Sequence, residues 1–148
     1  MTDWSSIVRQ HGPLVWQTAR RLLSNESDAS DCFQDAFVSA WELSRRETIR
    51  NWPSALRRLT TARALERLRR RYRDSQRTEA WPDASLADET AVPPGQSSID
   101  AELASQLRLA LSQIDPKQAE VFCLSVLEGL GYREVADQLG LTVNHVGV

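Results

Sequence analysis

The sequence predicts an all-α protein built from two small helical domains that a flexible acidic linker joins. Apolar residues recur at spacings of three and four along most of the 148-residue chain, which is the pattern of one face of a helix. No segment shows the alternation that is typical of a strand. The periodicity is lost over residues 74–98, where Pro, Ser and acidic residues gather, as in a flexible linker. We therefore predict one domain at residues 1–73 and another at residues 99–148.

Three helices are predicted in the first domain, over residues 4–23, 28–46 and 51–71. The second carries two Phe and one Trp among its inward positions and is expected to form the centre of the core. The third begins with Asn51 as its N-cap and with Pro53 in its first turn, where proline is tolerated. Its apolar residues mostly recur every three positions, so its apolar stripe drifts around the axis. This helix therefore bends or changes partners along its length, and the pattern leaves both open.

A long amphipathic helix is predicted at the start of the second domain, over residues 99–114. Asp115 and Pro116 begin the next helix, and Gly129 marks its end. The expected inner face of the first of these helices consists of Leu103, Leu107, Ala110, Leu111 and Ile114.

Residues 132–148 have the spacing of a helix-turn-helix. Ala136 is small where a second helix must cross closely, and Glu134 is placed to cap the start of the first helix. Gly140 permits the left-handed backbone of a tight turn. Val146 then returns the second helix onto the first.

Polar side chains near the start of the second helix of such a motif face the major groove of DNA. Here these are Asn144 and His145, with Thr142 placed for a phosphate. An ordinary αα-hairpin is the alternative interpretation.

The net charge of −2 hides a division of charge between the two halves of the chain. Residues 1–78 carry fifteen Arg and nine acidic residues, whereas residues 79–148 carry three basic and eleven acidic ones. Seventeen of the eighteen basic residues are Arg, the side chain that forks onto phosphate. This polarity predicts a polyanionic partner for the first half. A solvated basic helix face is the alternative.

The basic residues concentrate in residues 56–73, which carry eight Arg and one acidic residue. Such a ridge can follow a phosphate backbone, with binding that depends strongly on salt. Trp52 and Tyr72 offer aromatic surfaces for unstacked bases. The residues that helical spacing places on the basic face are Thr60, Arg63, Arg67 and Arg70.

An acidic edge is predicted on the second helix, where Asp28, Asp31 and Asp35 follow i, i+3, i+7 spacing with Gln34 beside them. Because an acidic edge gains nothing from facing DNA, we expect it to face a basic protein surface. The alternative is a solvated face that favours the helix N-terminus through its dipole.

The sequence argues against an enzyme and against a bound metal or cofactor. It holds two His and shows no metal-ligand cluster, nucleophile motif or glycine-rich phosphate loop. Cys32 and Cys123 fall among apolar positions and are expected to be small buried hydrophobes, with a disulfide or metal role as the alternative. No apolar run approaches the roughly 18 residues that a membrane span needs, and the start of the chain lacks a signal-peptide pattern. We therefore expect a cytoplasmic protein without a membrane segment.

Taken together, the three segments resemble the extracytoplasmic-function (ECF) RNA polymerase sigma factors. Residues 28–41 are similar to the part of conserved region 2 that grips the clamp helices of core RNA polymerase. Residues 56–71 are similar to the helix that reads and helps to open the minus-ten promoter element. The resemblance assigns polymerase binding to Asp31, Gln34, Asp35, Phe37 and Trp41. It assigns minus-ten DNA to Trp52, Thr60, Arg63, Arg67 and Arg70.

The helix-turn-helix resembles region 4 of the same family, which docks on the polymerase flap and reads the minus-thirty-five element. The resemblance assigns that element to Thr142, Asn144 and His145. It also implies that the recognition helix continues past Val148, so that this chain is truncated at its C-terminus. Ala62 departs from the family pattern, where Asn is common.

The resemblance predicts an alternative sigma factor that directs core polymerase to promoters, with an anti-sigma factor as a further partner. The rival interpretation is a sigma-like decoy, a protein-binding module that engages the anti-sigma regulator without starting transcription. Ala62 and the truncated end favour that rival slightly.

Overall fold

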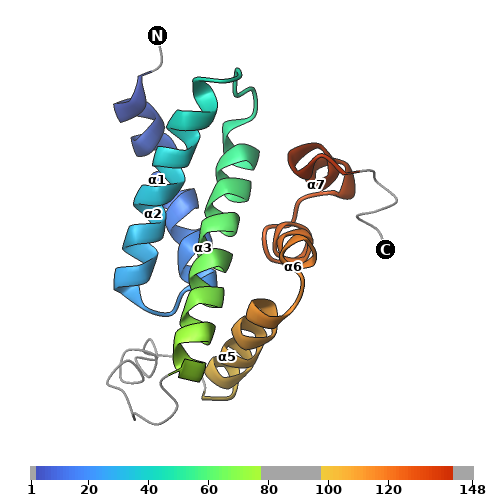
Figure 1. Cartoon of the computed structure of the whole chain (residues 1–148). Helices are drawn as coiled ribbons and strands as arrows, with labels where there is room; N and C mark the ends of the chain where they lie inside the picture. The colour runs from blue at the N-terminus through green and yellow to red at the C-terminus, as the bar shows by residue number, and fades with distance from the viewer. Residues whose placement is uncertain (1–2, 78–97, 142–148) are drawn as a thin grey trace.

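The computed structural model describes residues 3–77 and 98–141, and every regular element in these two ranges is helical. This confirms the predicted fold class (Figure 1). The elements in chain order are α1 (Trp4–Leu22), α2 (Glu26–Ser44), α3 (Trp52–Arg77), α5 (Ser98–Gln113), α6 (Pro116–Phe122), the π-helical turn η1 (Cys123–Leu127) and α7 (Tyr132–Leu139).

Short polar residues begin α1, α2, α3 and α6, because their side chains accept the backbone N–H groups that a helix start leaves unpaired. The predicted cap at Asn51 is confirmed: its Oδ1 accepts the N–H of Ser54 at 3.1 Å. Asn25 starts α2 in the same way by accepting the N–H of Asp28 at 3.1 Å. Asp115 starts α6, one position before Pro116.

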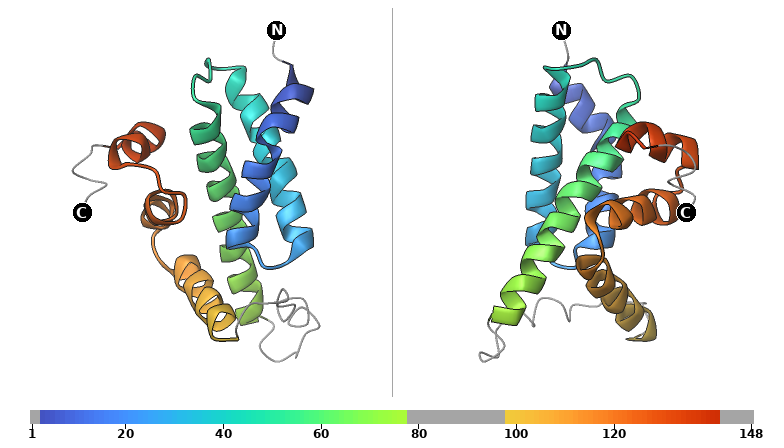
Figure 2. Two further views of the ribbon diagram at one scale, coloured as in Figure 1. Left: turned by 180° about the vertical axis from the view of Figure 1, so that it is seen from behind. Right: turned by 45° about the vertical axis from the view of Figure 1, so that its right-hand side comes forward.

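Helix α3 is longer than predicted and continues through Asp74–Arg77, into the range expected to be linker. At the other end of the predicted linker, Ser98 already belongs to α5, and residues 78–97 lie outside the described residues. The views agree that α1 and α2 pack on one side of α3 while α5, α6 and α7 lie along another (Figures 1 and 2). Because α3 is covered on more than one side, its apolar residues are not confined to a single stripe.

The two helical units share part of their hydrophobic core. One cluster of buried residues, which includes Val15, Phe37 and Leu56, belongs to α1, α2 and α3. Another crosses between the units. Its members are Ala19, Leu22, Leu23, Ala29, Cys32, Ala64, Leu65, Leu111, Ala119 and Cys123. The C-terminal unit is therefore docked on the N-terminal one by buried apolar contact.

The predicted inner face of α5 is wrong for most of its residues. Leu111 is 2% exposed, but Leu103, Leu107 and Ile114 are 59%, 36% and 39% exposed. An amphipathic pattern shows which face of a helix is apolar, yet it does not supply a neighbour to cover that face. In this fold α5 packs against α3, and most of its apolar face stays exposed.

The first helix of the predicted helix-turn-helix is α7, and the turn after it is confirmed. Gly140 adopts a φ of 68°, and the N–H of Leu141 donates to the carbonyl of Ala136 at 2.9 Å. The predicted cap at Glu134 is wrong, because no side chain caps α7. The carboxylate of Glu134 instead accepts the hydroxyl of Ser54 on α3 at 3.2 Å. Residues 142–148, which would complete the motif, lie outside the described residues.

Candidate interface on helices α2 and α3

The acidic edge of α2 and the basic face of α3 lie opposite one another. Arg67 Nη2 donates to Asp35 Oδ2 at 3.0 Å, and its Nη1 lies 3.8 Å from Asp31 Oδ2. One end of the row is closed by a hydrogen bond from Arg71 to Asp28. We call this row of pairs the α2–α3 seam. The two charged features that the sequence predicted for different partners thus neutralise each other in the free chain.

Within the α2–α3 seam, Arg67 faces two carboxylates, those of Asp31 and Asp35. Burial by itself lowers the pKa of Arg67, but the hydrogen bond and charge of Asp35, with the charges of Asp31 and Asp28, outweigh it and raise that pKa. The guanidinium therefore stays charged. Its Nε is buried without a hydrogen-bond partner, so the side chain is only partly satisfied where it lies.

The other predicted minus-ten residues occupy different environments. Arg63 Nε donates to Ser39 on α2 at 3.0 Å, whereas Arg70 is exposed. Thr60 is fully buried and donates its hydroxyl to the carbonyl of Leu56 at 2.6 Å. Its side chain therefore does not line the surface that Arg70 presents.

Aromatic residues frame one end of this surface. Trp52 is half-buried, and its ring meets that of Trp4 edge-on at 5.6 Å between centroids. Trp41 is 45% exposed, and the guanidinium of Arg45 lies 5.0 Å from its ring centroid, a distance typical of a cation–π contact. Phe37 is buried and packs against Phe33.

The predicted polymerase-binding residues are thus divided between surface and core. Asp31, Gln34 and Trp41 are exposed and Asp35 is half-exposed, while Phe37 holds α2 against the bundle. The structure adds Val38, which is 55% exposed between Gln34 and Trp41 on the same face of α2. Its signal in the sequence is an apolar residue that falls outside the inward stripe.

The two cysteines are buried and not disulfide-bonded. Burial, more than any neighbouring charge, raises the pKa of Cys32 and of Cys123 to about 12. Both are neutral thiols at physiological pH. No group of three or more His, Cys, Asp or Glu within residues 3–77 and 98–141 could hold a metal ion. The remaining predicted site residues, Thr142, Asn144 and His145, lie outside the described residues.

Comparison with known families decides which proteins share this arrangement. The family model Sigma-70 region 2 matches residues 7–78, and the model Sigma-70, region 4 matches residues 104–148. The chain is 30% identical to the RNA polymerase sigma factor CnrH of Cupriavidus metallidurans, over 97% of this chain and 78% of that protein. This chain belongs to the ECF sigma factors. The resemblance stated from the sequence is confirmed.

In two further relatives, this chain covers different shares of the other protein's length. The chain is 32% identical to the ECF RNA polymerase sigma factor SigE of Mycolicibacterium smegmatis, over 99% of this chain and 56% of that protein. It is 30% identical to the ferric citrate uptake sigma factor FecI of Escherichia coli, over 92% of this chain and 77% of that protein. The chain therefore spans little more than half the length of the SigE relative.

Solved structures of sigma factors share the fold. The sigma factor RpoE of Bartonella quintana, in complex with the anti-sigma factor NepR, superposes with a TM-score of 0.61 at 22% identity, over 99% of this chain and 89% of that one. CnrH in complex with the cytosolic domain of CnrY superposes with a TM-score of 0.56 at 25% identity, over 97% of this chain and 77% of that one. Sigma factors as a family are not enzymes. Among the described helices, none is both long and apolar enough to cross a membrane.

Proposed function

We propose that this ECF sigma factor binds core RNA polymerase in the cytoplasm and directs it to specific promoters. The observation that carries the proposal is the exposed row on α2. Gln34, Val38 and Trp41 lie on one face of the helix beside the carboxylates of the α2–α3 seam. Exposed Trp in a surface row is a common anchor of protein interfaces, and the adjacent carboxylates suit a basic partner such as the polymerase clamp.

The promoter-binding surface that we propose lies on α3. Arg70 is exposed, and Arg63 and Arg67 lie on the same side of the helix, held by partners on α2. Trp52 at the start of α3 is half-buried and offers an aromatic surface for an unstacked base. Phosphate contacts by these arginines position the DNA and make the affinity fall steeply with salt.

Thr60 is better assigned to the core, because its hydroxyl is already used within α3. For the minus-thirty-five element, Thr142, Asn144 and His145 stay predictions from the helix-turn-helix spacing. An anti-sigma protein is proposed as the regulator because RpoE has been solved in complex with the anti-sigma factor NepR, and CnrH has been solved with the cytosolic domain of CnrY.

A binding assay with core RNA polymerase tests the α2 surface. Trp41→Ala is expected to weaken binding about 10- to 30-fold, the usual loss at an interfacial Trp. Glu47→Gln, an exposed change of charge beyond the end of α2, is the control and should bind as the parent chain does. Equal affinity of the parent and of Trp41→Ala would remove this surface from the proposal.

Run-off transcription with a promoter library tests the activity itself. We expect initiation from a subset of promoters that core polymerase alone does not use. If the chain binds polymerase and starts no transcript, the sigma-like decoy becomes the better interpretation.

A further inference from the structure

The contact between the two helical units contains a buried carboxylate, that of Glu128. Its side chain is 2% exposed, and charged groups are rarely buried this far without partners. Both oxygens are occupied by the N-terminal unit: the hydroxyl of Thr18 donates to Oε1, and Arg21 forms an ion pair with Oε2. Arg57 of α3 lies beside them, with Nε 3.9 Å from Oε1.

A local distortion of the chain delivers Glu128 to this position. The turn before it, η1, is π-helical, and the N–H of Glu128 donates to the carbonyl of Cys123 at 2.9 Å, five residues back. Gly129 then reverses the chain with a φ of 73°. Single π-helical turns are less favourable than α-helix and often occur at functional positions.

Arg21 is held at both ends by the C-terminal unit. Its Nη1 also donates to the carbonyl of Leu127 at 3.2 Å, while its own carbonyl accepts two N–H groups from Arg108 at 3.2 and 3.3 Å. We call the set Thr18, Arg21, Arg57 and Glu128 the Glu128 latch.

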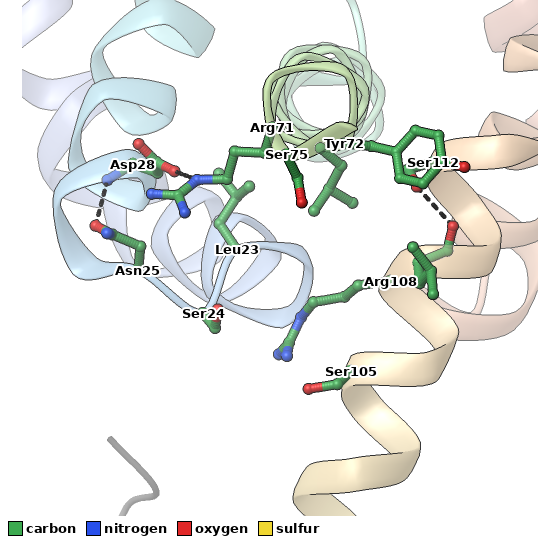
Figure 3. Close-up of a pocket in the computed structure, with 12 residues that line it drawn as sticks. Leu23, Ser24, Asn25, Asp28, Arg71, Tyr72, Ser75, Ser105, Arg108 and Ser112 are labelled. Carbon is green, nitrogen blue, oxygen red and sulfur yellow. Dashed lines mark hydrogen bonds and ion pairs between the residues drawn. The ribbon is translucent and has the colours of Figure 1, made fainter. Parts of the chain in front are cut away.

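Elsewhere the contact between the units is less complete. An open pocket of about 290 Å³ separates the end of α3 from α5, and Tyr72 and Arg108 are among its lining residues (Figure 3). At the α7 end, side-chain hydrogen bonds from Ser54 to Glu134 and from Arg58 to Gln138 cross the contact, each at 3.2 Å.

Buried polar atoms without partners also work against the contact. Nε and Nη2 of Arg69 are buried without a hydrogen bond, as is the hydroxyl of Thr61. Arg69 is close enough to η1 to lower the pKa of Cys123 against the larger effect of burial, and Thr61 lines the same small cavity as Glu128. Burying such hydrogen-bond donors without a partner destabilises the closed state. Once exposed, the same donors can bind water or an anion.

We propose that the free chain rests in a closed state, in which the Glu128 latch holds the helix-turn-helix unit on the N-terminal unit. Opening separates Glu128 from α1 and uncovers Arg57, Arg58 and Arg69 on α3. A closed chain cannot extend its two units along separate stretches of a partner. The latch itself is a property of the free chain, while its role as a brake on polymerase and promoter binding rests on the proposed function.

Distance measurement between two spin labels tests the closed state directly. Labels at Gln17→Cys on α1 and Lys117→Cys on α6 lie on exposed positions of the two units. The native thiols of Cys32 and Cys123 are buried and neutral, because burial raises their pKa to about 12. Cys32 should remain unlabelled. Every protein in the comparison, the parent included, also carries Cys123→Ala, because Cys123 lies in the cluster that both units share and opening would expose it. Pulsed electron-spin resonance then reports the distribution of distances in the full chain.

The parent chain is expected to give one narrow distance. Glu128→Gln removes the charge that Arg21 and Arg57 share and should add a broad population at longer distance. Arg21→Gln removes the charged partner of Glu128 instead and should have the same effect. Because the Arg21 side chain is 47% exposed, the fold should tolerate this change. Glu102→Gln, on an exposed position of α5, removes the same charge outside the latch and should match the parent.

A broad distribution in the parent, or a parent-like narrow distribution in both latch variants, overturns the proposal. Circular dichroism identifies a variant that has unfolded. If Glu128→Gln unfolds, Arg21→Gln decides the result. Because the measurement uses the free chain, its failure is distinct from a failure to bind polymerase, which tests the proposed function.

Discussion

Two neighbouring threonines in α3 give opposite expectations for the same substitution. Thr60 and Thr61 are both fully buried. The hydroxyl of Thr60 donates to the carbonyl of Leu56 at 2.6 Å, whereas the hydroxyl of Thr61 has no partner. Valine has nearly the same shape as threonine and the same branching at Cβ, so replacing each by Val changes chiefly the hydrogen bonding. The pair forms a matched experiment within one helical turn.

We expect Thr60→Val to lower the free energy of unfolding by about 1 kcal/mol, the usual net value of an intramolecular hydrogen bond. Thr61→Val should raise it by about 1 kcal/mol, because it removes a buried hydroxyl that is not satisfied. The two variants should therefore differ by about 2 kcal/mol. For a chain of this size that corresponds to a separation of roughly 4–8 °C in Tm.

Urea denaturation followed by circular dichroism and by tryptophan fluorescence measures both values. Equal shifts of the same sign, or destabilisation by Thr61→Val beyond about 1 kcal/mol, would refute the reasoning. A promoter-binding measurement on the same proteins separates structure from recognition. Folded Thr60→Val should bind promoter DNA as the parent does, because the Thr60 side chain is buried within α3.

Three further predictions concern the thiols, the turn and the α2–α3 seam. Cys32 and Cys123 should react with an aromatic disulfide at pH 8 only when the chain unfolds, and fast reaction of the native chain would contradict their burial. The pKa of each thiol is about 12 in the folded chain and 9.0 in the unfolded chain. Their contribution to the free energy of unfolding is therefore constant below pH 9 and falls as the pH rises from 9 to 12. Gly140→Ala should cost about 1–2 kcal/mol of stability through its positive φ alone, since a Cβ there meets nothing within 4 Å, and a neutral thermal shift would argue against the left-handed turn. Asp35→Asn should lower the free energy of unfolding by about 1 kcal/mol at low salt and by less at 1 M salt. In a double-mutant cycle, its effect should depend on whether Arg67→Gln is also present. If the two effects are fully additive, the ion pair contributes nothing to stability.

The sequence by itself determined the helices, some of their starts and the family. Caps such as Asn51 and turns such as Gly140 depend on a few neighbouring residues, so they can be predicted from local chemistry. The ECF resemblance likewise depends on residue types at fixed spacing along α2, α3 and α7. These features need no knowledge of what lies on the other side of the molecule.

The tertiary structure alone decided which faces meet. A charged residue in a sequence can pair with a partner protein, with DNA or with another part of the same chain, and the sequence does not distinguish these cases. Asp35 was predicted to face polymerase and Arg67 to face DNA, but in the structure they form an ion pair with each other. The apolar stripe of α5 was expected to be covered, and the fold leaves Leu103 exposed because no helix in the described residues packs there. Glu128 gave no signal at all, since its burial depends on Thr18 and Arg21, more than a hundred residues away in the chain. Contacts between residues so far apart in the sequence depend on how the helices pack against one another. The apolar periodicity of a single helix does not show which helix will be its neighbour.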